Sequence, residues 1–286
     1  MVLNALGNLH RLFSTHPLSR HAPMQAWLRF ASWQVRSRIS EEVVVPWVDG
    51  QRLAVRNGMT GATGNIYVGL HEFADMMFPL HFLRDRDLFF DVGANVGTYT
   101  VLASGVCKAK TWAFEPDPLT VERLARNVEV NHLADLVTIF ECAIGAVQGA
   151  VHVTTGRDTL NRVASGSEAD VRSVRQETLD GLTASVGPIM LKIDVEGYEA
   201  NVLCGSHALL VNSLLKAVEL ETVDEDIHRI MIDSGFERAY YQPFTRNLHA
   251  APVEPPASNA LFVRDRQFVQ ERLRTARKIN ILGVRI

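Results

Sequence analysis

The sequence predicts an α/β fold with a doubly wound sheet, and three observations support this. An apolar strand at residues 88–92 opens into a glycine loop and then into a helix-compatible segment, 98–107. A second apolar strand, 111–114, ends in a carboxylate, Glu115. Further strand patterns alternate with helical ones later in the chain, as expected for strands joined by crossover helices. The later strands are expected at 137–142, 189–193, 217–220 and 260–263, and the helices at 118–131, 196–210 and 224–234.

Shorter elements are expected before and within this series. Residues 43–48 and 52–55 favour a hairpin, because Asp49-Gly50 between them is a strong hairpin turn. A loop at 58–64 and a helix at 71–83 would follow. Residues 151–155 are rich in β-branched side chains and predict a small strand. The polar stretch 156–174 is interpreted as irregular, either a substrate loop or a mobile insertion.

Composition limits the classes of protein that fit. The 286 residues are 47% hydrophobic, which allows one large domain with appendages. A formal charge of −3, without basic residues interleaved with aromatic ones, gives no reason to expect nucleic acid. No apolar run approaches the roughly 18 residues of a spanning helix. The three cysteines are widely spaced and form neither a disulfide framework nor a zinc cluster, so we expect a reducing, cytoplasmic location.

Both ends of the chain are basic. The first forty residues contain five arginines and no acidic residue before Glu41, which suits either a transit peptide or a helical extension. Trp27 and Trp33 favour the extension, with an aromatic face packed on the domain. A second basic stretch, 264–278, predicts a C-terminal helix with a solvated charged face; a surface role toward an acidic membrane or partner is the alternative. The predicted parts are a basic extension, 1–42, a domain, 43–263, with its hairpin at 43–56, and a basic helix and tail, 264–286.

The glycine loop indicates the kind of ligand. Its spacing is Gly93-x-x-x-Gly97, and Asn95 stands where a dinucleotide fingerprint has its middle glycine, so a pyrophosphate would fit poorly. S-adenosylmethionine has no phosphate, and its amine, carboxylate and ribose diol suit polar side chains such as Asp91 and Asn95. Glu115 lies 24 residues after Asp91, a spacing that suits a carboxylate accepting ribose hydroxyls. The alternative is that the glycines only form a turn.

A second group of polar residues follows the strand at 189–193. Lys192, Asp194 and Glu196 occupy every second position, so as long as the strand continues their side chains point to the same side. A lysine inside an apolar strand needs a partner, because an isolated buried charge is too costly. The acids alone could instead cap the next helix. The following strand ends in a further pair, of which Glu219 is the better candidate for the site and Glu221 the weaker one.

These motifs resemble the FkbM-type S-adenosylmethionine-dependent methyltransferases. The resemblance is carried by residues 90–97 (FDVGANVG), 113–116 (AFEP), 191–197 (LKIDVEG), the pair Asn127 and Asn131, and 259–262 (NALF). It implies a Rossmann-like, seven-stranded class I methyltransferase sheet, mostly parallel with its last strand antiparallel and with helices on both faces. It also implies methyl transfer, usually to a hydroxyl of a sugar, glycan or secondary metabolite. The cofactor would contact the loop, including Ala94, and its adenine would lie near Cys142 and Ala143.

Such a site must hold the acceptor oxygen, the methyl carbon and the sulfur in line. An alcohol needs a base, and Asp194 or Glu196 would serve, with Lys192 orienting them. His228 is another candidate base. A divalent metal on Asp194, Glu196 and Glu219 is the rival mechanism, although their spacing does not require one.

Asn65 and Tyr67 would close over the methionine end of the cofactor or merely fix a turn. The acceptor is expected to be a small molecule or a glycan. An NAD-dependent oxidoreductase and a non-catalytic binding or scaffold module are the two alternative functions. The sequence indicates neither the acceptor's identity nor an oligomeric state.

Overall fold

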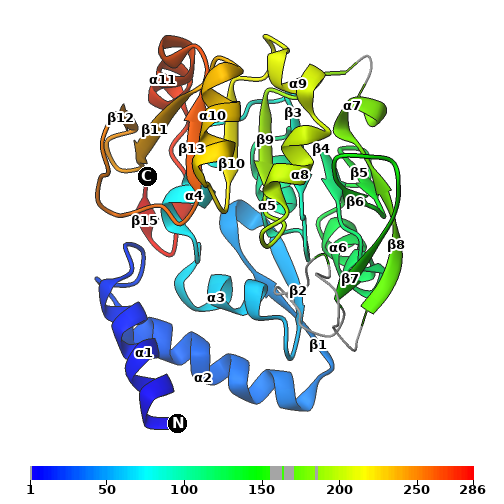
Figure 1. Cartoon of the computed structure of the whole chain (residues 1–286). Helices are drawn as coiled ribbons and strands as arrows, with labels where there is room; N and C mark the ends of the chain where they lie inside the picture. Colours follow the sequence, from blue (N-terminus) through cyan, green and yellow to red (C-terminus); the bar gives the residue numbers. More distant parts are fainter. Residues whose placement is uncertain (1, 155–162, 164–170, 184–185) are drawn as a thin grey trace.

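The computed structural model describes residues 2–154, 163, 171–183 and 186–286 (Figure 1). Its centre is an eight-stranded sheet in the order β12-β11-β13-β10-β9-β3-β4-β5. The pairs β4/β5, β3/β4, β3/β9 and β9/β10 are parallel, whereas β13 runs antiparallel to both β10 and β11. The predicted mostly parallel sheet with its last strand reversed is therefore confirmed, and the short β12 adds an eighth strand at the edge. The strands are β3 (Leu88–Val92), β4 (Lys110–Phe114), β5 (Val137–Phe140), β9 (Met190–Ile193), β10 (Ala217–Leu220), β11 (Glu237–Gln242), β12 (Asn247–His249) and β13 (Ala260–Val263).

Helices cover both faces of this sheet (Figure 1). On one face Phe89 and Met190 pack with α4 (Phe73–Phe82) and the C-terminal α11 (Arg266–Thr275). On the other face Phe90 and Leu191 pack with a second group of helices. Successive strand residues thus enter opposite apolar layers, which explains why these strands are mainly apolar in sequence. The second group is α8 (Glu199–Cys204), α9 (His207–Val211) and α10 (Glu225–Asp233), and the first face also carries α5 (Thr98–Val101), the π-helical turn η2 (Leu102–Val106) and α6 (Pro118–Val130).

The predicted hairpin is present as β1 (Glu42–Pro46) and β2 (Arg52–Arg56), joined through the short turn η1 (Val48–Gly50). Two amides of α6 hold it to the domain. Asn127 accepts from the backbone of Ala54 at 2.7 Å and donates to Val96 at 2.9 Å. Asn131 bonds both backbone groups of Arg52, at 2.7 and 2.8 Å. The two asparagines of the family pattern therefore fix the position of the hairpin.

The basic N-terminal segment forms two helices, α1 (Val2–Thr15) and α2 (Pro23–Ile39), along one edge of the molecule (Figure 1). Trp33 is buried, and Phe13 meets Trp27 edge to face at 5.0 Å. Phe30 makes a similar contact with Tyr67 at 5.3 Å. An aromatic face thus packs on the domain. None of the helices in the described part of the chain combines the length and apolar character that a bilayer span requires.

Three local predictions were wrong. The loop at 58–64 is part of helix α3 (Thr60–Val68), because Ala62 and Val68 are buried in the aromatic cluster of α1 and α2. The helix predicted at 196–210 is instead a loop followed by α8 and α9. The strand at 137–142 stops at Phe140, and the chain continues into a separate three-stranded sheet.

That small sheet consists of β6 (Ala143–Ile144), β7 (Gly149–Thr154) and β8 (Val171–Glu177), and α7 (Leu179–Leu182) follows it. The strand expected at 151–155 thus belongs to β7, and β8 begins inside the stretch predicted as irregular. Most of that stretch, 156–162 and 164–170, lies outside the described residues. A further hairpin, β14 (Asn280–Ile281) with β15 (Val284–Arg285), ends the chain.

Gly93 brings β3 and β9 into direct contact where both strands end. It has a φ of +79°, and a Cβ there would lie 1.8 Å from the backbone oxygen of Asp194. Because this neighbour is backbone in a central strand pair, it cannot move aside cheaply. The contact, rather than the approach of a ligand alone, explains the glycine.

We predict that Gly93→Ala lowers the free energy of unfolding by about 3 kcal/mol, combining overpacking with left-handed backbone strain. Gly58→Ala is the matched control, since Gly58 has a φ of +94° and nothing within 4 Å of the added Cβ. It should cost only about 1 kcal/mol. Urea unfolding measures the free energy of unfolding of both variants. Equal losses in the two variants would mean that β3 and β9 can move apart at Gly93 to make room for the added Cβ.

Candidate active site

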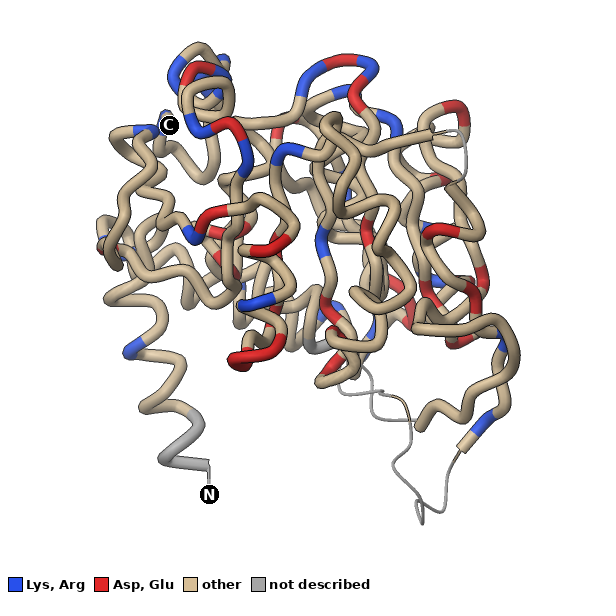
Figure 2. The backbone as a smooth tube through the Cα atoms, turned by 45° about the horizontal axis from the view of Figure 1, so that its top comes forward, with Lys and Arg blue, Asp and Glu red and all other residues tan. Residues whose placement is uncertain are grey.

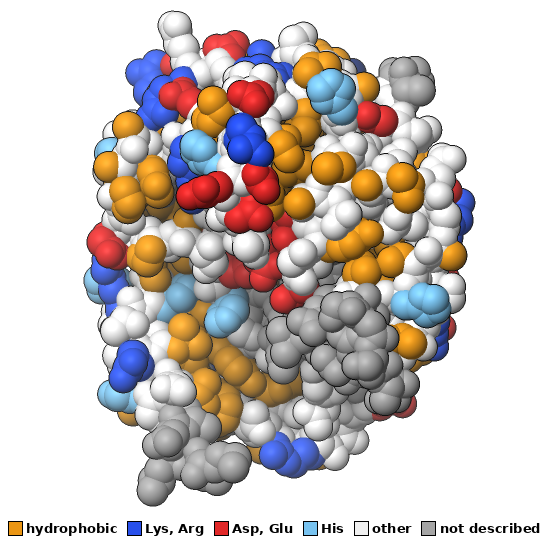
Figure 3. Space-filling view, in the orientation of Figure 1, with side chains coloured by type: hydrophobic (Ala, Val, Ile, Leu, Met, Phe, Trp, Pro, Cys, Tyr) orange, Lys and Arg blue, Asp and Glu red, His pale blue; other side chains and the backbone are white. Residues whose placement is uncertain are grey.

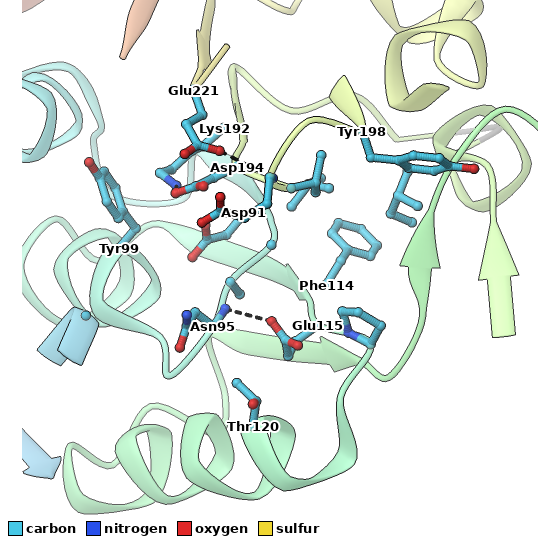
Figure 4. Close-up of a pocket in the computed structure, with 18 of the residues that line it drawn as sticks. Asp91, Asn95, Tyr99, Phe114, Glu115, Thr120, Lys192, Asp194, Tyr198 and Glu221 are labelled. Atoms are coloured by element: carbon cyan, nitrogen blue, oxygen red, sulfur yellow. Dashed lines mark hydrogen bonds and ion pairs between the residues drawn. The ribbon is translucent and has the colours of Figure 1, made fainter. Parts of the chain in front are cut away.

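A cavity of about 570 Å³ opens at the carboxyl ends of β3, β4 and β9 (Figure 4). The chain crosses from β3 to β4 and β5 on one side and returns through β9 and β10 on the other. This switch in direction leaves a crevice in which open α/β sheets bind their ligands. Figure 3, in the orientation of Figure 1, shows acidic side chains gathered near the middle of the visible face of the molecule.

Glu115 is held in a fixed position at one side of the cavity. Its two carboxylate oxygens accept from the backbone N–H groups of Asn95 and Asp117, both at 3.0 Å (Figure 4). Burial raises its pKa to about 7, although these two donors oppose the rise. Asn95 has a φ of +51°, so the glycine loop turns its amide toward Glu115. The carboxylate is oriented before any ligand arrives.

Asp91 lies at the floor of the cavity, at the end of β3. It is buried, and its Oδ2 accepts from the hydroxyl of Thr100 at 2.6 Å. Its Oδ1 is also buried and has no hydrogen-bond partner within the residues that the structure describes. Burial raises the pKa of Asp91, against the attraction of Lys192. An unsatisfied buried acceptor beside a cavity is costly, so a ligand donor would stabilise it.

Lys192 lies fully inside the sheet, and, as predicted, its charge is partnered. Its ammonium is 2.6 Å from Oδ2 of Asp194 and 4.4 Å from the centroid of the Tyr99 ring. In the sheet register Lys192 stands between Asp91 on β3 and Glu219 on β10. Burial disfavours its charge, but Asp194, Asp91 and Glu72 raise the pKa of the ammonium. Lys192 therefore remains charged.

The loop at 194–198 takes the place of the predicted helix start. Buried Glu199, the first residue of α8, accepts from the backbone N–H groups of Val195 and Gly197, both at 3.3 Å. Glu196 has a φ of +52°, and its N–H donates to Oε2 of Glu221 at 3.3 Å. The acids of this segment thus shape a loop rather than cap a helix at that point.

Three carboxylates meet above this loop. Asp194, Glu196 and Glu221 each have an oxygen within 4.8 Å of the others. Burial and the nearby charges of Asp194 and Glu196 raise the pKa of Glu221 to about 8. Burial opposes ionisation of Asp194, but Lys192 and a hydrogen bond with Glu221 lower its pKa. At neutral pH a proton therefore resides on Glu221, next to an ionised Asp194.

Carboxylate oxygens are ligands that divalent cations such as Ca²⁺ and Mg²⁺ prefer, so Asp194, Glu196 and Glu221 could together hold one. The ammonium of Lys192 already neutralises Asp194 at 2.6 Å, and the proton on Glu221 reduces the negative charge further. The sequence predicted Asp194, Glu196 and Glu219 as possible metal ligands, whereas the carboxylates that lie together include Glu221 in place of Glu219.

Most predicted site residues line the cavity, but five do not. Gly97 lies behind the lining, where a Cβ would meet Leu124 at 2.3 Å. Asn65 is buried and accepts from the N–H of His71 at 2.8 Å, which fixes a turn, the second of the two roles considered. Tyr67, Glu219 and His228 are also outside the lining. The lining includes Asp91, Gly93, Ala94, Asn95, Glu115, Cys142, Ala143, Lys192, Asp194 and Glu196.

The positions of the last three follow from their elements. Tyr67 packs in the aromatic cluster with Phe13 and Phe30. Glu219 points under α4, where burial and Asp75 raise its pKa. His228 is exposed on α10, with its ring 5.9 Å from that of Phe262.

Several lining residues were missed in the sequence. Tyr99 donates to Glu72 at 2.7 Å, and both side chains border the cavity. Tyr198 and Asn259 border it elsewhere. Tyr99 and Tyr198 each follow a glycine of a recognised motif by one or two positions, which is the signal that could have identified them.

Fold and site together define a Rossmann-like methyltransferase of class I: the sheet order, the reversed β13 and a cavity beyond β3, β4 and β9 are those of this class. The profile of the methyltransferase FkbM domain matches residues 91–237. The chain belongs to the FkbM methyltransferase family.

Two curated methyltransferases and one solved structure illustrate what the chain is similar to. Hexuronic acid methyltransferase AglP of Haloferax volcanii is 25% identical over 156 residues, which cover 53% of this chain and 64% of that protein. Methyltransferase sdnD of Sordaria araneosa is 25% identical over 205 residues, covering 58% of this chain and 79% of that protein. The crystal structure of a precorrin-6y C5,15-methyltransferase from Geobacter metallireducens has a TM-score of 0.43 at 15% identity, covering 74% of this chain and 94% of that one.

We predict that Lys192→Met lowers the free energy of unfolding by about 3–5 kcal/mol, because it leaves buried carboxylates without their counter-charge. Their pKa values in the folded state would rise above those in the unfolded state. The folded protein would then bind more protons, so the loss should grow from pH 5 to pH 8.

Lys216→Met is the matched control. Lys216 pairs with Asp265 at 3.4 Å on the surface, and the partner side chain is 47% exposed. This change should cost less than about 1 kcal/mol at either pH. Denaturant titrations at the two pH values test both variants, and a pH-independent loss for Lys192→Met would contradict the assigned charge balance.

Proposed function

We propose that this protein is an S-adenosylmethionine-dependent methyltransferase that methylates a hydroxyl oxygen of a small-molecule or glycan acceptor. The observation that carries the proposal is the pairing of a fixed carboxylate, Glu115, with an unsatisfied buried oxygen of Asp91 across one cavity. The cavity volume, about 570 Å³, is within the range of cofactor sites.

The donor set suits this cofactor. Oδ1 of Asp91 is placed to accept from its amine, and Glu115, whose oxygens already point into the cavity, from its ribose hydroxyls. Cys142 and Ala143 line the continuation of the cavity and would border the adenine. Asn95 occupies the loop position that a dinucleotide fingerprint reserves for glycine, which disfavours NAD.

The carboxylate group at the other side would handle the proton. S-adenosylmethionine supplies an electrophilic methyl group, and the acceptor hydroxyl must lose its proton as the oxygen attacks. Lys192 keeps Asp194 ionised, while Glu221 titrates near pH 8. We propose that the pair of Asp194 and Glu221 accepts this proton, with Glu221 as the final acceptor once it is ionised.

The acceptor would enter from the side of His71 and Glu72. Both residues, with Ser258, line the cavity and also a neighbouring groove of about 550 Å³. Phe244, which is 40% exposed, lies in this groove with its ring 5.3 Å from that of buried Phe73 and could stack on a sugar ring. The hexuronic acid in the name of AglP supports a sugar as acceptor.

We predict that S-adenosylhomocysteine binds the purified protein and that Glu115→Ala weakens its binding by about 1.5–3 kcal/mol, the scale of a hydrogen bond to a charged group. Glu115→Gln keeps the shape and should show part of the loss. Isothermal titration calorimetry measures the affinities.

Glu122→Ala, on the exposed side of α6, is the control and should bind as the unchanged protein does. NAD titrated in the same way should give no heat. Binding of NAD alone would favour an oxidoreductase, and binding of neither ligand a scaffold; each result would refute the proposal.

We predict that methyl transfer increases with pH through an apparent pKa near 8, because protonated Glu221 cannot accept a proton. Glu221→Gln should remove this step and lower the rate by about tenfold or more. Asp194→Asn should retain cofactor binding and lose most of the transfer. Labelled cofactor incubated with cell extract, followed by mass spectrometry, gives the rates and identifies the acceptor.

Glu225→Gln, on the exposed start of α10, should leave the profile unchanged. If the rate of methyl transfer by Glu221→Gln still rises through an apparent pKa near 8, a group other than Glu221 accepts the proton.

A further inference from the structure

Helix α2 is apolar on two opposite faces. Its inner face carries buried Ala26 and Trp33 and joins the aromatic cluster under the domain. Its outer face exposes large apolar side chains to solvent. These are Met24, Leu28, Val35 and Ile39, with exposed fractions of 70, 64, 58 and 79%.

The four outer side chains form one stripe. Their spacings of four, seven and four residues place them within an arc of roughly 60° around the helix. Ala31, also exposed, lies about 20° beyond Met24, next to this arc. Single exposed apolar residues are ordinary, but an aligned set along four turns marks an interaction surface. In Figure 1 α2 lies along the lower edge of the molecule, so a flat partner can reach the stripe without meeting the sheet.

Arginines flank the stripe on both sides. Arg38 lies on one side, and Arg36 and Arg29 lie on the other. Arg36 donates to the backbone of Val44 and Arg38 to the side chain of Gln34. Within the described residues neither guanidinium has an ion pair, and the first forty residues contain no Asp or Glu. The tube of α1 in Figure 2 shows no acidic residue either.

This charge pattern selects the partner. A second copy meeting the same face would bring arginines against arginines, which costs free energy. In an anionic bilayer the apolar stripe would insert among the lipid chains, and the flanking arginines would contact the negatively charged headgroups. This is how amphipathic helices lie in a membrane surface. We propose that the outer face of α2 binds an anionic membrane surface. The proposal does not depend on methyl transfer.

The test is flotation of the full chain with lipid vesicles at low salt. Vesicles of equal parts phosphatidylcholine and phosphatidylserine should bind the protein at least about tenfold better than phosphatidylcholine alone, and added salt should reduce the binding. Two double variants, Leu28→Ser with Ile39→Ser and Arg36→Gln with Arg38→Gln, should each reduce it about tenfold. Thermal unfolding confirms that each variant is folded.

The matched control is Val211→Ser with Leu214→Ser, because these side chains are 58 and 60% exposed but lie at the other end of the molecule, near α9. This control should bind vesicles as the unchanged chain does. Absence of binding, equal binding to both kinds of vesicle, or binding unaffected by the α2 variants would overturn the proposal. So would a dimer in sedimentation velocity that Leu28→Ser with Ile39→Ser dissociates, since a second copy would then cover the stripe.

Discussion

The buried ammonium of Lys192 is the interaction on which the site depends. It lies in the middle strand of the sheet with Asp91 beside it on β3, Asp194 at 2.6 Å and the face of Tyr99 above it. None of these charges is solvated enough to stand alone, and removing one partner would leave the others uncompensated. The pairing therefore fixes β3 against β9, two segments that are about a hundred residues apart in the chain. The close contact of Gly93 with the backbone of Asp194 also brings β3 and β9 together, at the ends of the two strands.

This arrangement separates the carboxylates of one cavity into different protonation states. Lys192 holds Asp194 ionised, and burial together with the charges of Asp194 and Glu196 raises the pKa of Glu221 to about 8. Glu115 is oriented by two backbone donors, and burial raises its pKa to about 7. Pairs of carboxyl groups whose surroundings push their pKa values apart are how one site holds both an acid and a base. The proposed division between a cofactor side and a proton-accepting side rests on these surroundings.

The sequence predicted those features that depend on local pattern. β10 and β13 have the predicted limits, because buried central strands are short and mainly apolar. Lys192 stood out because a lysine in such a run requires a partner. The sequence favoured Glu219 over Glu221, although the shared parity of the two acids would point both to one side. β10 ends at Leu220, so alternation no longer orients Glu221, and it is Glu221 that lines the cavity. Likewise Thr60–Val68 contains residues typical of a loop and forms a helix through contacts with α2, distant in sequence.

The N-terminal segment shows most clearly why pattern alone is insufficient. A helix with apolar side chains on two opposite faces, as α2 has, is normally expected to be covered on both of them. The structure covers only the face with Trp33 and leaves Leu28 and Ile39 in solvent, and a net charge of −3 for the chain conceals a segment without acids. The connection from α1 to α2, including His16 and Arg20, also lines the groove that continues from the active cavity. If the acceptor occupies this groove and α2 lies on a membrane, one segment forms both surfaces. An acceptor attached to a lipid would then reach the cavity through that groove without the protein leaving the membrane.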